Sequence, residues 1–331
     1  MNSKFRNLHP NLSNHLLDNF ANNQIEANIC LIGDTGFVGK WLVFMAQELK
    51  NLDIGSIRVT GLSRGTFSTK ELDSSFHHLF IEELPRLDLK EFTHLIWAAS
   101  STSRNQNYDS SNLLFDKLIS QILSQKFEGY LINLSSGIVY EKSFTTYGPI
   151  DEDSQTHRID KEFLSNYAIN KIYIEDKLSN FANEVGLKFI NTRLFSFCGP
   201  GMPMASGYAM HDFFSRVINN QDIIIEGNPD TLRSYMHPFD LVVKLFELII
   251  EQPIITNLNI GSSDVRTISY FANQISKLRD LRVLTKSNHL SIERQNYFPD
   301  TSLLNELTKS KPYFSTQSML EDTYNYYLNR N

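Results

Sequence analysis

A tyrosine and a lysine stand four residues apart in SNYAINKIYIEDKL, a segment with the periodicity of a helix. This spacing places the side chains of Tyr167 and Lys171 on the same face of that helix. A tyrosine with an ordinary pKa of about 10 is a poor acid–base group at neutral pH. An adjacent ammonium group stabilises the phenolate and lowers that pKa. The pair therefore predicts proton transfer by Tyr167, with Lys171 tuning it.

Two serines end the apolar run of LINLSSGIVYE, upstream of this pair. A hydroxyl group on Ser135 or Ser136 could hydrogen-bond the carbonyl or hydroxyl of a substrate held beside Tyr167. Gly137 follows the serines, so a plain turn at the end of a strand is the competing interpretation. A Tyr–Lys pair alone recurs by chance, but the two motifs together favour an active site that both serines would share.

Three glycines lie three residues apart in NICLIGDTGFVGKWL, between a short apolar run and a helical pattern. Glycine allows a sharp turn at the first position, close approach of a pyrophosphate at the second, and close packing of helix on strand at the third. The N-terminus of the helix offers free N–H groups and a positive dipole end to phosphates. The sequence therefore predicts a dinucleotide site. Its loop residues would be Gly33, Thr35, Gly36, Phe37, Val38 and Gly39.

The end of the second apolar run, GLSRG, bears on the choice of dinucleotide. The acidic residue that holds the ribose 2′-hydroxyl of NAD is expected about 20 residues after the glycine loop. Ser63 and Arg64 stand there instead, and an arginine suits a 2′-phosphate. NADP is therefore favoured and NAD is the alternative, although Arg64 could also be an ordinary arginine in a surface turn.

The elements that would position these residues alternate along the chain. Short apolar runs at 28–32, 57–62, 94–99, 130–134 and 189–195 alternate with helical segments such as 111–125 and 160–182. Such alternation indicates an α/β fold of the Rossmann type, with a doubly wound parallel sheet. We expect an N-terminal extension at 1–26, a dinucleotide-binding domain at 27–195, and a smaller α+β portion at 196–331 that binds substrate. Residues 237–262 would return to the first domain.

Composition narrows the partners. The chain has 331 residues, 41% of them hydrophobic, and a formal net charge of -6, which argues against a nucleic-acid partner. Cys30 and Cys198 lie in apolar stretches without a CxxC neighbour, so we expect neither a disulfide framework nor a metal site. The N-terminus has no signal-like apolar run, and LVVKLFELIIEQPII is too short and too charged to span a bilayer. We expect a soluble cytoplasmic protein.

The motifs together resemble those of the extended short-chain dehydrogenase/reductases, the branch that includes nucleotide-sugar epimerases, dehydratases and 4-ketoreductases. The resemblance runs from about residue 28 to residue 327. GDTGFVGK is similar to the family's glycine loop, and PDTSLLNEL to its C-terminal Pro-Asp-x-Ser stretch. HLIWAAS resembles a motif that lies under the adenine and ribose, which implies that Ala98 and Ala99 contact the cofactor. The resemblance also implies catalysis by Ser136, Tyr167 and Lys171, a ribose contact for Lys171, and a homodimer.

Two further segments bear on the substrate. RSYMHPFDLV resembles a pattern of sugar-nucleotide 4-epimerases in which the arginine binds the nucleotide diphosphate, which implies that role for Arg233. Without the resemblance, Arg233 would be interpreted as a surface arginine on a turn. RLFSFCGPG is similar to the family's Arg-x-x-Asn-x-x-Gly-Pro segment, but Ser196 replaces the asparagine, which weakens the substrate contact implied there.

The positions at which this sequence differs from the motifs of the family bear on the reaction. Sugar 4,6-dehydratases carry Asp-Glu where this chain has Gly137 and Ile138, and neither residue can move a proton, so dehydration is disfavoured. Ser63 and Arg64 favour NADPH-dependent reduction of a nucleotide-linked 4-keto-6-deoxy sugar, in deoxysugar or surface-polysaccharide biosynthesis. The alternatives are an NAD-dependent nucleotide-sugar 4-epimerase and a non-catalytic cofactor sensor. The Tyr–Lys pair argues against the sensor.

Overall fold

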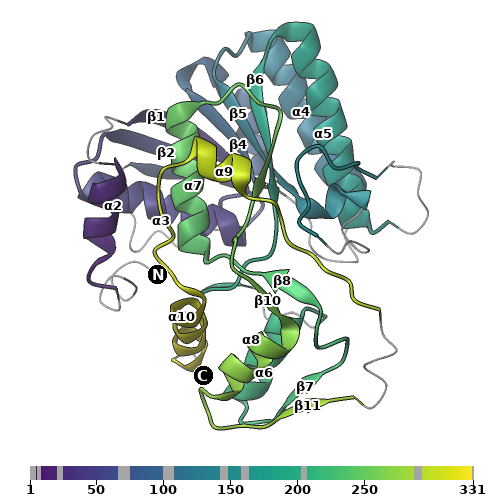
Figure 1. Cartoon of the computed structure of the whole chain (residues 1–331). Coiled ribbons are helices and arrows are strands. Elements are labelled where there is room, and N and C mark those ends of the chain that lie inside the picture. Colours follow the sequence, from purple (N-terminus) through teal and green to yellow (C-terminus); the bar gives the residue numbers. More distant parts are fainter. Residues whose placement is uncertain are drawn as a thin grey trace.

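A parallel sheet forms the centre of the protein (Figure 1). The computed structural model describes residues 5, 9–20, 25–65, 75–99, 108–141, 148–157, 164–202, 207–286 and 293–329. Seven strands lie in the order β3-β2-β1-β4-β5-β6-β9 and pair in parallel. The order reverses between β1 and β4, where open α/β sheets bind their ligands. This confirms the Rossmann-type sheet. The strands are β1 (Glu26–Ile32), β2 (Ser56–Ser63), β3 (Phe76–Phe80), β4 (His94–Trp97), β5 (Tyr130–Ser136), β6 (Lys188–Leu194) and β9 (Asn257–Ile260).

Helices cover both faces of the sheet. Successive residues of a strand point to opposite faces, so a strand covered on both sides must be apolar throughout, as the ICLI run of β1 is. Ile29 and Leu31 pack with α3 (Phe37–Asn51) and α7 (Pro238–Glu251). Cys30 and Ile32 pack on the other face with α4 (Tyr108–Gln125) and α5 (Asn166–Val185).

The ends of α5 are set by its own sequence. The side chain of Ser165 caps the N-terminus by accepting a hydrogen bond from the backbone N–H of Ala168, 3.2 Å away. Gly186 ends the helix in the left-handed conformation at φ 72°, where glycine is favoured. These caps put Tyr167 in the first turn of α5 and Lys171 one turn later.

A smaller group of elements lies below the sheet in Figure 1. There, β7 pairs with β11 in parallel and β8 pairs with β10 in antiparallel fashion. Because β9 lies beside β6 in the large sheet, the segment 238–260 belongs to the sheet layer. The division of the chain between residues 195 and 196 stays a prediction. The elements of this group are α6 (Ala209–Ile218), β7 (Ile223–Ile225), β8 (Leu232–Ser234), β10 (Val265–Thr267), α8 (Ile268–Ser276), β11 (Val283–Thr285) and α10 (Thr316–Leu328), whereas α9 (Ser302–Leu307) lies beside β9 in the sheet layer (Figure 1).

The N-terminal extension is part of the core. Helix α2 (Leu12–Phe20) buries Leu12, Leu16 and Phe20, which lie four apart and so share one face. The ring of Phe5 meets the ring of Trp41 edge-on at a centroid distance of 5.2 Å. The extension therefore packs on the helix that follows the glycine loop.

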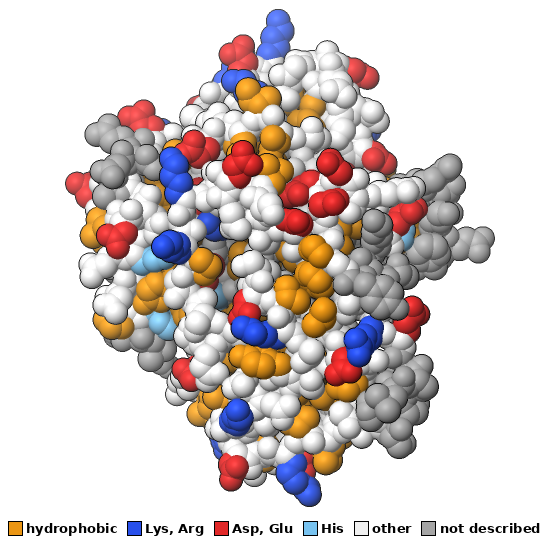
Figure 2. Space-filling view, viewed as in Figure 1, with side chains coloured by type: hydrophobic (Ala, Val, Ile, Leu, Met, Phe, Trp, Pro, Cys, Tyr) orange, Lys and Arg blue, Asp and Glu red, His pale blue; other side chains and the backbone are white. Residues whose placement is uncertain are grey.

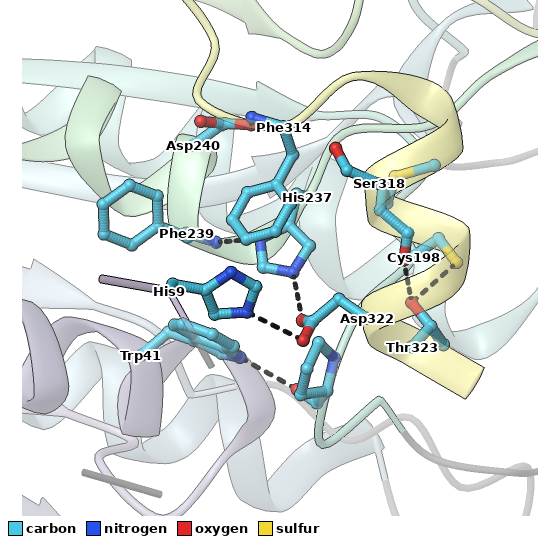
Figure 3. A network of polar contacts seen from close by, with 12 residues as sticks. His9, Trp41, Cys198, His237, Phe239, Asp240, Phe314, Ser318, Asp322 and Thr323 are labelled. Carbon is cyan, nitrogen blue, oxygen red and sulfur yellow. Dashed lines mark hydrogen bonds and ion pairs between the residues drawn. The ribbon is translucent and has the colours of Figure 1, made fainter. Parts of the chain in front are cut away.

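A carboxylate of α10 joins the N-terminal extension to the start of α7 (Figure 3). Asp322 of α10 lies 2.9 Å from Nε2 of His9 and 3.1 Å from Nε2 of His237. His237 accepts a hydrogen bond from the backbone N–H of Phe239 through Nδ1, so its Nε2 carries the proton that it donates to Asp322. The ring of Phe314 stacks on His237 at 3.6 Å. One buried carboxylate thus holds α10, the start of α7 and the extension together.

We expect acid to weaken this anchor. Burial opposes ionisation of Asp322, but hydrogen bonds from His237 and His9 outweigh it and lower the pKa of Asp322. A carboxylate whose pKa is depressed by folding stabilises the fold above its unfolded pKa of about 3.9 and loses that effect as pH falls through its folded pKa. Asp322→Asn should lower the free energy of unfolding by about 1.5–3 kcal/mol at pH 7. It should also flatten the loss of stability below pH 5.

Urea denaturation between about pH 2 and pH 8 measures both effects, because the loss lies below the unfolded pKa of about 3.9. Asp18→Asn is the matched control because Asp18 is an exposed carboxylate of the same extension. Equal stability of Asp322→Asn and wild type at pH 7 would contradict the anchor.

Candidate active site

The glycine loop forms a cradle between β1 and α3. Gly33 has φ 105°, a conformation that favours glycine, and its carbonyl accepts a hydrogen bond from the N–H of Gly36 at 3.1 Å. Gly36 stands at the N-cap of α3, and no side chain caps this helix. The first N–H groups of α3 are therefore available to an anion.

Two close backbone approaches require glycine here. A Cβ atom on Gly33 would lie 2.7 Å from the backbone of Ala98 and Ala99. A Cβ atom on Gly39 would lie 2.2 Å from the carbonyl oxygen of Gly33. The structure thus places Ala98 and Ala99 against the glycine loop. Thr35 lies on the other side, near Gly65 in the turn that follows β2.

We expect Gly39→Ala to damage this cradle. The new methyl group would meet backbone that cannot move without shifting the loop, at a cost of about 1–3 kcal/mol. Binding of NADPH should weaken about ten-fold or more, as measured by the change in cofactor fluorescence. Gly227→Ala is the matched control, because a Cβ atom on Gly227 meets nothing within 4 Å. Equal cofactor affinity of the two variants would contradict the prediction.

The carboxyl end of β2 carries no acid. The hydroxyl of Ser63 is buried and donates to the carbonyl of Gly65 at 3.2 Å, whereas Arg64 is exposed. The nearest acid in the loop, Asp34, is fully buried and pairs with Nδ1 of His78 at 2.6 Å. The Asp34 side chain occupies the space above Gly61, because a Cβ atom on Gly61 would lie 2.3 Å from Oδ2 of Asp34. Sequence reasoning missed this pair, although an aspartate inside the glycine loop was a signal.

Three candidate catalytic residues meet at the ends of β5 and α5. Lys171 is buried, and its ammonium donates to the carbonyl of Leu134 at 2.6 Å. The same ammonium lies 5.7 Å from the centroid of the Tyr167 ring. Ser136 hydrogen-bonds the Tyr167 hydroxyl. The structure therefore brings Ser136, Tyr167 and Lys171 together.

The protonation of this group differs from the sequence expectation. We expected Lys171 to lower the pKa of Tyr167. Instead burial raises the pKa of Tyr167, and the hydrogen bond to Ser136 opposes the rise only in part. Burial also lowers the pKa of Lys171 to about 8, against the opposing charge of Glu175. Desolvation disfavours both charged forms, so Tyr167 is a phenol at neutral pH.

Arg233 lies beyond this group, on β8. Its Nη1 donates to the carbonyl oxygens of Leu232, at 2.9 Å, and of Gln295. Burial lowers its pKa, and no carboxylate of the described residues is within salt-bridge distance of it. A half-buried guanidinium bound only to carbonyls retains donors for an anion. Ser196 is half-buried near β8, and its carbonyl accepts from the N–H of Met236 at 3.0 Å.

Comparison with known proteins identifies the family. A model of the NAD dependent epimerase/dehydratase family matches residues 29–261. The chain belongs to this family. No curated protein matches the chain.

Solved structures share the fold of this family member. One is UDP-glucuronic acid 4-epimerase from Bacillus cereus in complex with UDP-glucuronic acid and NAD, with a TM-score of 0.74, 18% identity and coverage of 92% of this chain and 100% of that chain. UDP-glucose 4-epimerase from Thermotoga maritima has a TM-score of 0.72 and 17% identity, with coverage of 92% of this chain and 99% of that chain. dTDP-glucose 4,6-dehydratase from Bacillus anthracis has a TM-score of 0.75 and 15% identity, with coverage of 92% of this chain and 97% of that chain. The resemblance to the extended short-chain dehydrogenase/reductases is confirmed, and the chain is an NAD(P)-dependent enzyme of that type.

Ser135 takes no part in the contacts among Ser136, Tyr167 and Lys171 in this epimerase/dehydratase family member. The Ser135 hydroxyl donates to Glu175, which lies eight residues after Tyr167 on the same helix α5. Glu175 in turn pairs with Arg193 at 2.7 Å. The structure therefore places Ser135 in a buried ion-pair cluster, and a substrate contact for it stays a prediction.

A second tyrosine stands at the catalytic group and was missed by sequence reasoning. Tyr297 hydrogen-bonds Ser136, and its ring packs against the ring of Phe195 in a tilted arrangement at a centroid distance of 4.8 Å. A Cβ atom on Gly137 would lie 2.7 Å from the Tyr297 hydroxyl. Gly137 thus makes room for a phenol, and Arg233 lies 6.0 Å beyond the centroid of that ring. The missing side chain at Gly137 was the signal in the sequence.

Two further observations concern membrane spans and surface charge. No helix in the described parts of the chain is long and apolar enough to cross a membrane. On the face shown in Figure 2, Lys and Arg side chains are scattered among acidic ones.

Proposed function

We propose that this enzyme uses NADPH to reduce the C4 carbonyl of a nucleotide-linked 4-keto-6-deoxy sugar. The observation that carries the proposal is the end of β2, where Arg64 is exposed and none of the described residues 62–65 is an acid that could hold a ribose 2′-hydroxyl. A guanidinium there suits a 2′-phosphate. The glycine cradle, the uncapped α3 and the two alanines that follow β4 fit the rest of a dinucleotide.

The geometry supports the chemistry of reduction. When bound, NADPH supplies a hydride to C4. Tyr167 then protonates the developing alkoxide, a role for which its raised pKa keeps the proton on the phenol. Ser136 orients the carbonyl, and Lys171 holds the nicotinamide ribose. Arg233 binds the diphosphate of the sugar nucleotide.

An NAD-dependent nucleotide-sugar 4-epimerase is the second candidate. Two observations favour it: the family model, and the shared fold with UDP-glucuronic acid 4-epimerase in complex with NAD. An epimerase must first take a proton from the C4 hydroxyl, which requires the phenolate form of Tyr167. The raised pKa of Tyr167 opposes that form and so favours reduction.

A fluorescence titration with NADPH and NADH tests the cofactor. We expect NADPH to bind about ten-fold or more tightly, because a charge-assisted contact to the 2′-phosphate contributes about 1.5–3 kcal/mol. Arg64→Ala should remove this preference by weakening NADPH binding alone. Oxidation of NADPH by dTDP-4-keto-6-deoxyglucose tests the reaction. NAD that remains bound through purification, together with equal binding of the two reduced cofactors, would make the epimerase the leading function.

We also propose a homodimer formed through α4 and α5. These helices lie together on one face of the sheet (Figure 1), and the exposed side chains of Leu113 and Leu123 on α4 and Val185 on α5 support a covered surface. Light scattering after size exclusion, with Leu123→Glu as the test variant, measures the state in solution.

A further inference from the structure

An exposed aromatic side chain ends β3. Phe80 is 51% exposed, although burial of a phenylalanine side chain is worth about 1.5–3 kcal/mol. It lies at the carboxyl edge of the sheet, in register with Ser63 at the end of β2. Ligands of open α/β sheets bind along this edge, so the position of Phe80 calls for an apolar occupant.

The strand order shows which part of a dinucleotide passes Phe80. The glycine loop follows β1 and would hold the pyrophosphate, and the catalytic Ser136 ends β5, on the β4 side of β1. The nicotinamide half must therefore extend toward β5. The adenosine half must extend the other way, over β2 and β3. Adjacent strands of a sheet lie about 4.8 Å apart.

A chain of contacts links Phe80 to the glycine loop. The Phe80 ring lies edge-on to His78 at a centroid distance of 5.9 Å. His78 in turn pairs with Asp34, two residues before Gly36 in the loop. Phe80 thus contacts the buried pair through His78, and 51% of its surface remains exposed. An exposed aromatic ring at the edge of the sheet where the adenosine half would lie is suited to stack on a base.

We propose that Phe80 is the adenine-binding residue of this enzyme and that it recognises the face of the base rather than its edge. The proposal rests on the dinucleotide cofactor of the proposed function. Phenylalanine cannot hydrogen-bond the 6-amino group of adenine, and the neighbouring Ser63 hydroxyl is already bound to Gly65. The site should therefore bind the dinucleotide through stacking and the phosphate contacts, with little discrimination between purines.

Fluorescence titrations of the full-length protein test the proposal. Phe80→Ala should weaken NADPH about ten-fold or more, since stacking of a base on an aromatic side chain contributes about 5- to 150-fold by alanine substitution. Phe80→Tyr should retain the affinity. Competition by 2′,5′-ADP, which lacks the nicotinamide, should weaken by the same factor in Phe80→Ala. His77→Ala is the matched control, because His77 is an exposed residue of the same strand that points to the opposite face.

A second titration distinguishes the face of the base from its edge. The hypoxanthine analogue of NADH lacks the 6-amino group, and we expect it to bind within about three-fold of NADH. Loss of ten-fold or more with this analogue would overturn the proposal and indicate an edge contact. Equal NADPH binding by Phe80→Ala and wild type would overturn it as well. If the wild-type protein bound neither NADPH nor NADH, the proposed function itself would fail, which is a different result from a failure at Phe80.

Discussion

We expect the Tyr167→Phe enzyme to reduce its 4-keto sugar about 100- to 10,000-fold more slowly than wild type, while NADPH affinity changes by less than about three-fold. In the proposed reaction the phenol of Tyr167 donates a proton to the alkoxide at C4, and phenylalanine retains the ring but not that proton. Tyr167 contacts Ser136 and faces Lys171, so the substitution removes one hydroxyl from an otherwise intact site. Single-turnover oxidation of bound NADPH measures the hydride step without interference from product release.

Tyr297→Phe is the informative control for this prediction. It removes the other phenol that hydrogen-bonds Ser136 and leaves the proposed donor in place, so it should cost much less than Tyr167→Phe. If Tyr297→Phe were the slower enzyme, the proton donor would be Tyr297 and the assignment of Tyr167 would be wrong. Equal rates for wild type and Tyr167→Phe would exclude Tyr167 as the proton donor.

The sequence could predict the sheet and the proximity of Ser136, Tyr167 and Lys171 because both depend on local patterns. A buried parallel strand is a short apolar run, and the caps of α5, Ser165 and Gly186, are local signals as well. A spacing of four on a helix brings Tyr167 and Lys171 together whatever the rest of the chain does. The same locality explains why Ser136 could be placed beside them, since it ends the neighbouring strand.

The remaining features depend on residues that are distant in the chain. Tyr297 reaches Ser136 from 161 positions away, and no periodicity encodes such a contact. The choice between Ser135 and Ser136 depended on which hydroxyl contacts Tyr167 and which contacts Glu175, and both partners lie on α5, far along the chain from the serines. Burial also governs the pKa of Tyr167. A sequence motif contains the neighbouring charge of Lys171 but not the cost of desolvation, so the direction of that shift was wrong.

The second large effect concerns the ion pair behind the catalytic group. Arg193 of β6 and Glu175 of α5 are both buried and are joined by hydrogen bonds from Nε, at 3.1 Å, and from Nη2, at 2.7 Å. Removal of one partner leaves a buried charge uncompensated, which costs about 3–5 kcal/mol. We expect Arg193→Met to lower the free energy of unfolding by that amount, as measured by urea denaturation with an unchanged m-value.

The double variant Glu175→Leu/Arg193→Met separates the loss of the pair from the penalty of an unpaired charge. Because apolar replacement of a whole buried pair is often neutral, the double variant should recover most of the stability that Arg193→Met loses. Glu175 also lies four residues after Lys171 and opposes the fall in its pKa. The double variant should therefore fold well and yet lose reduction at a lower pH than wild type, since Lys171 without Glu175 gives up its proton more easily. A stable double variant with the wild-type pH profile would limit the ion pair to a structural role.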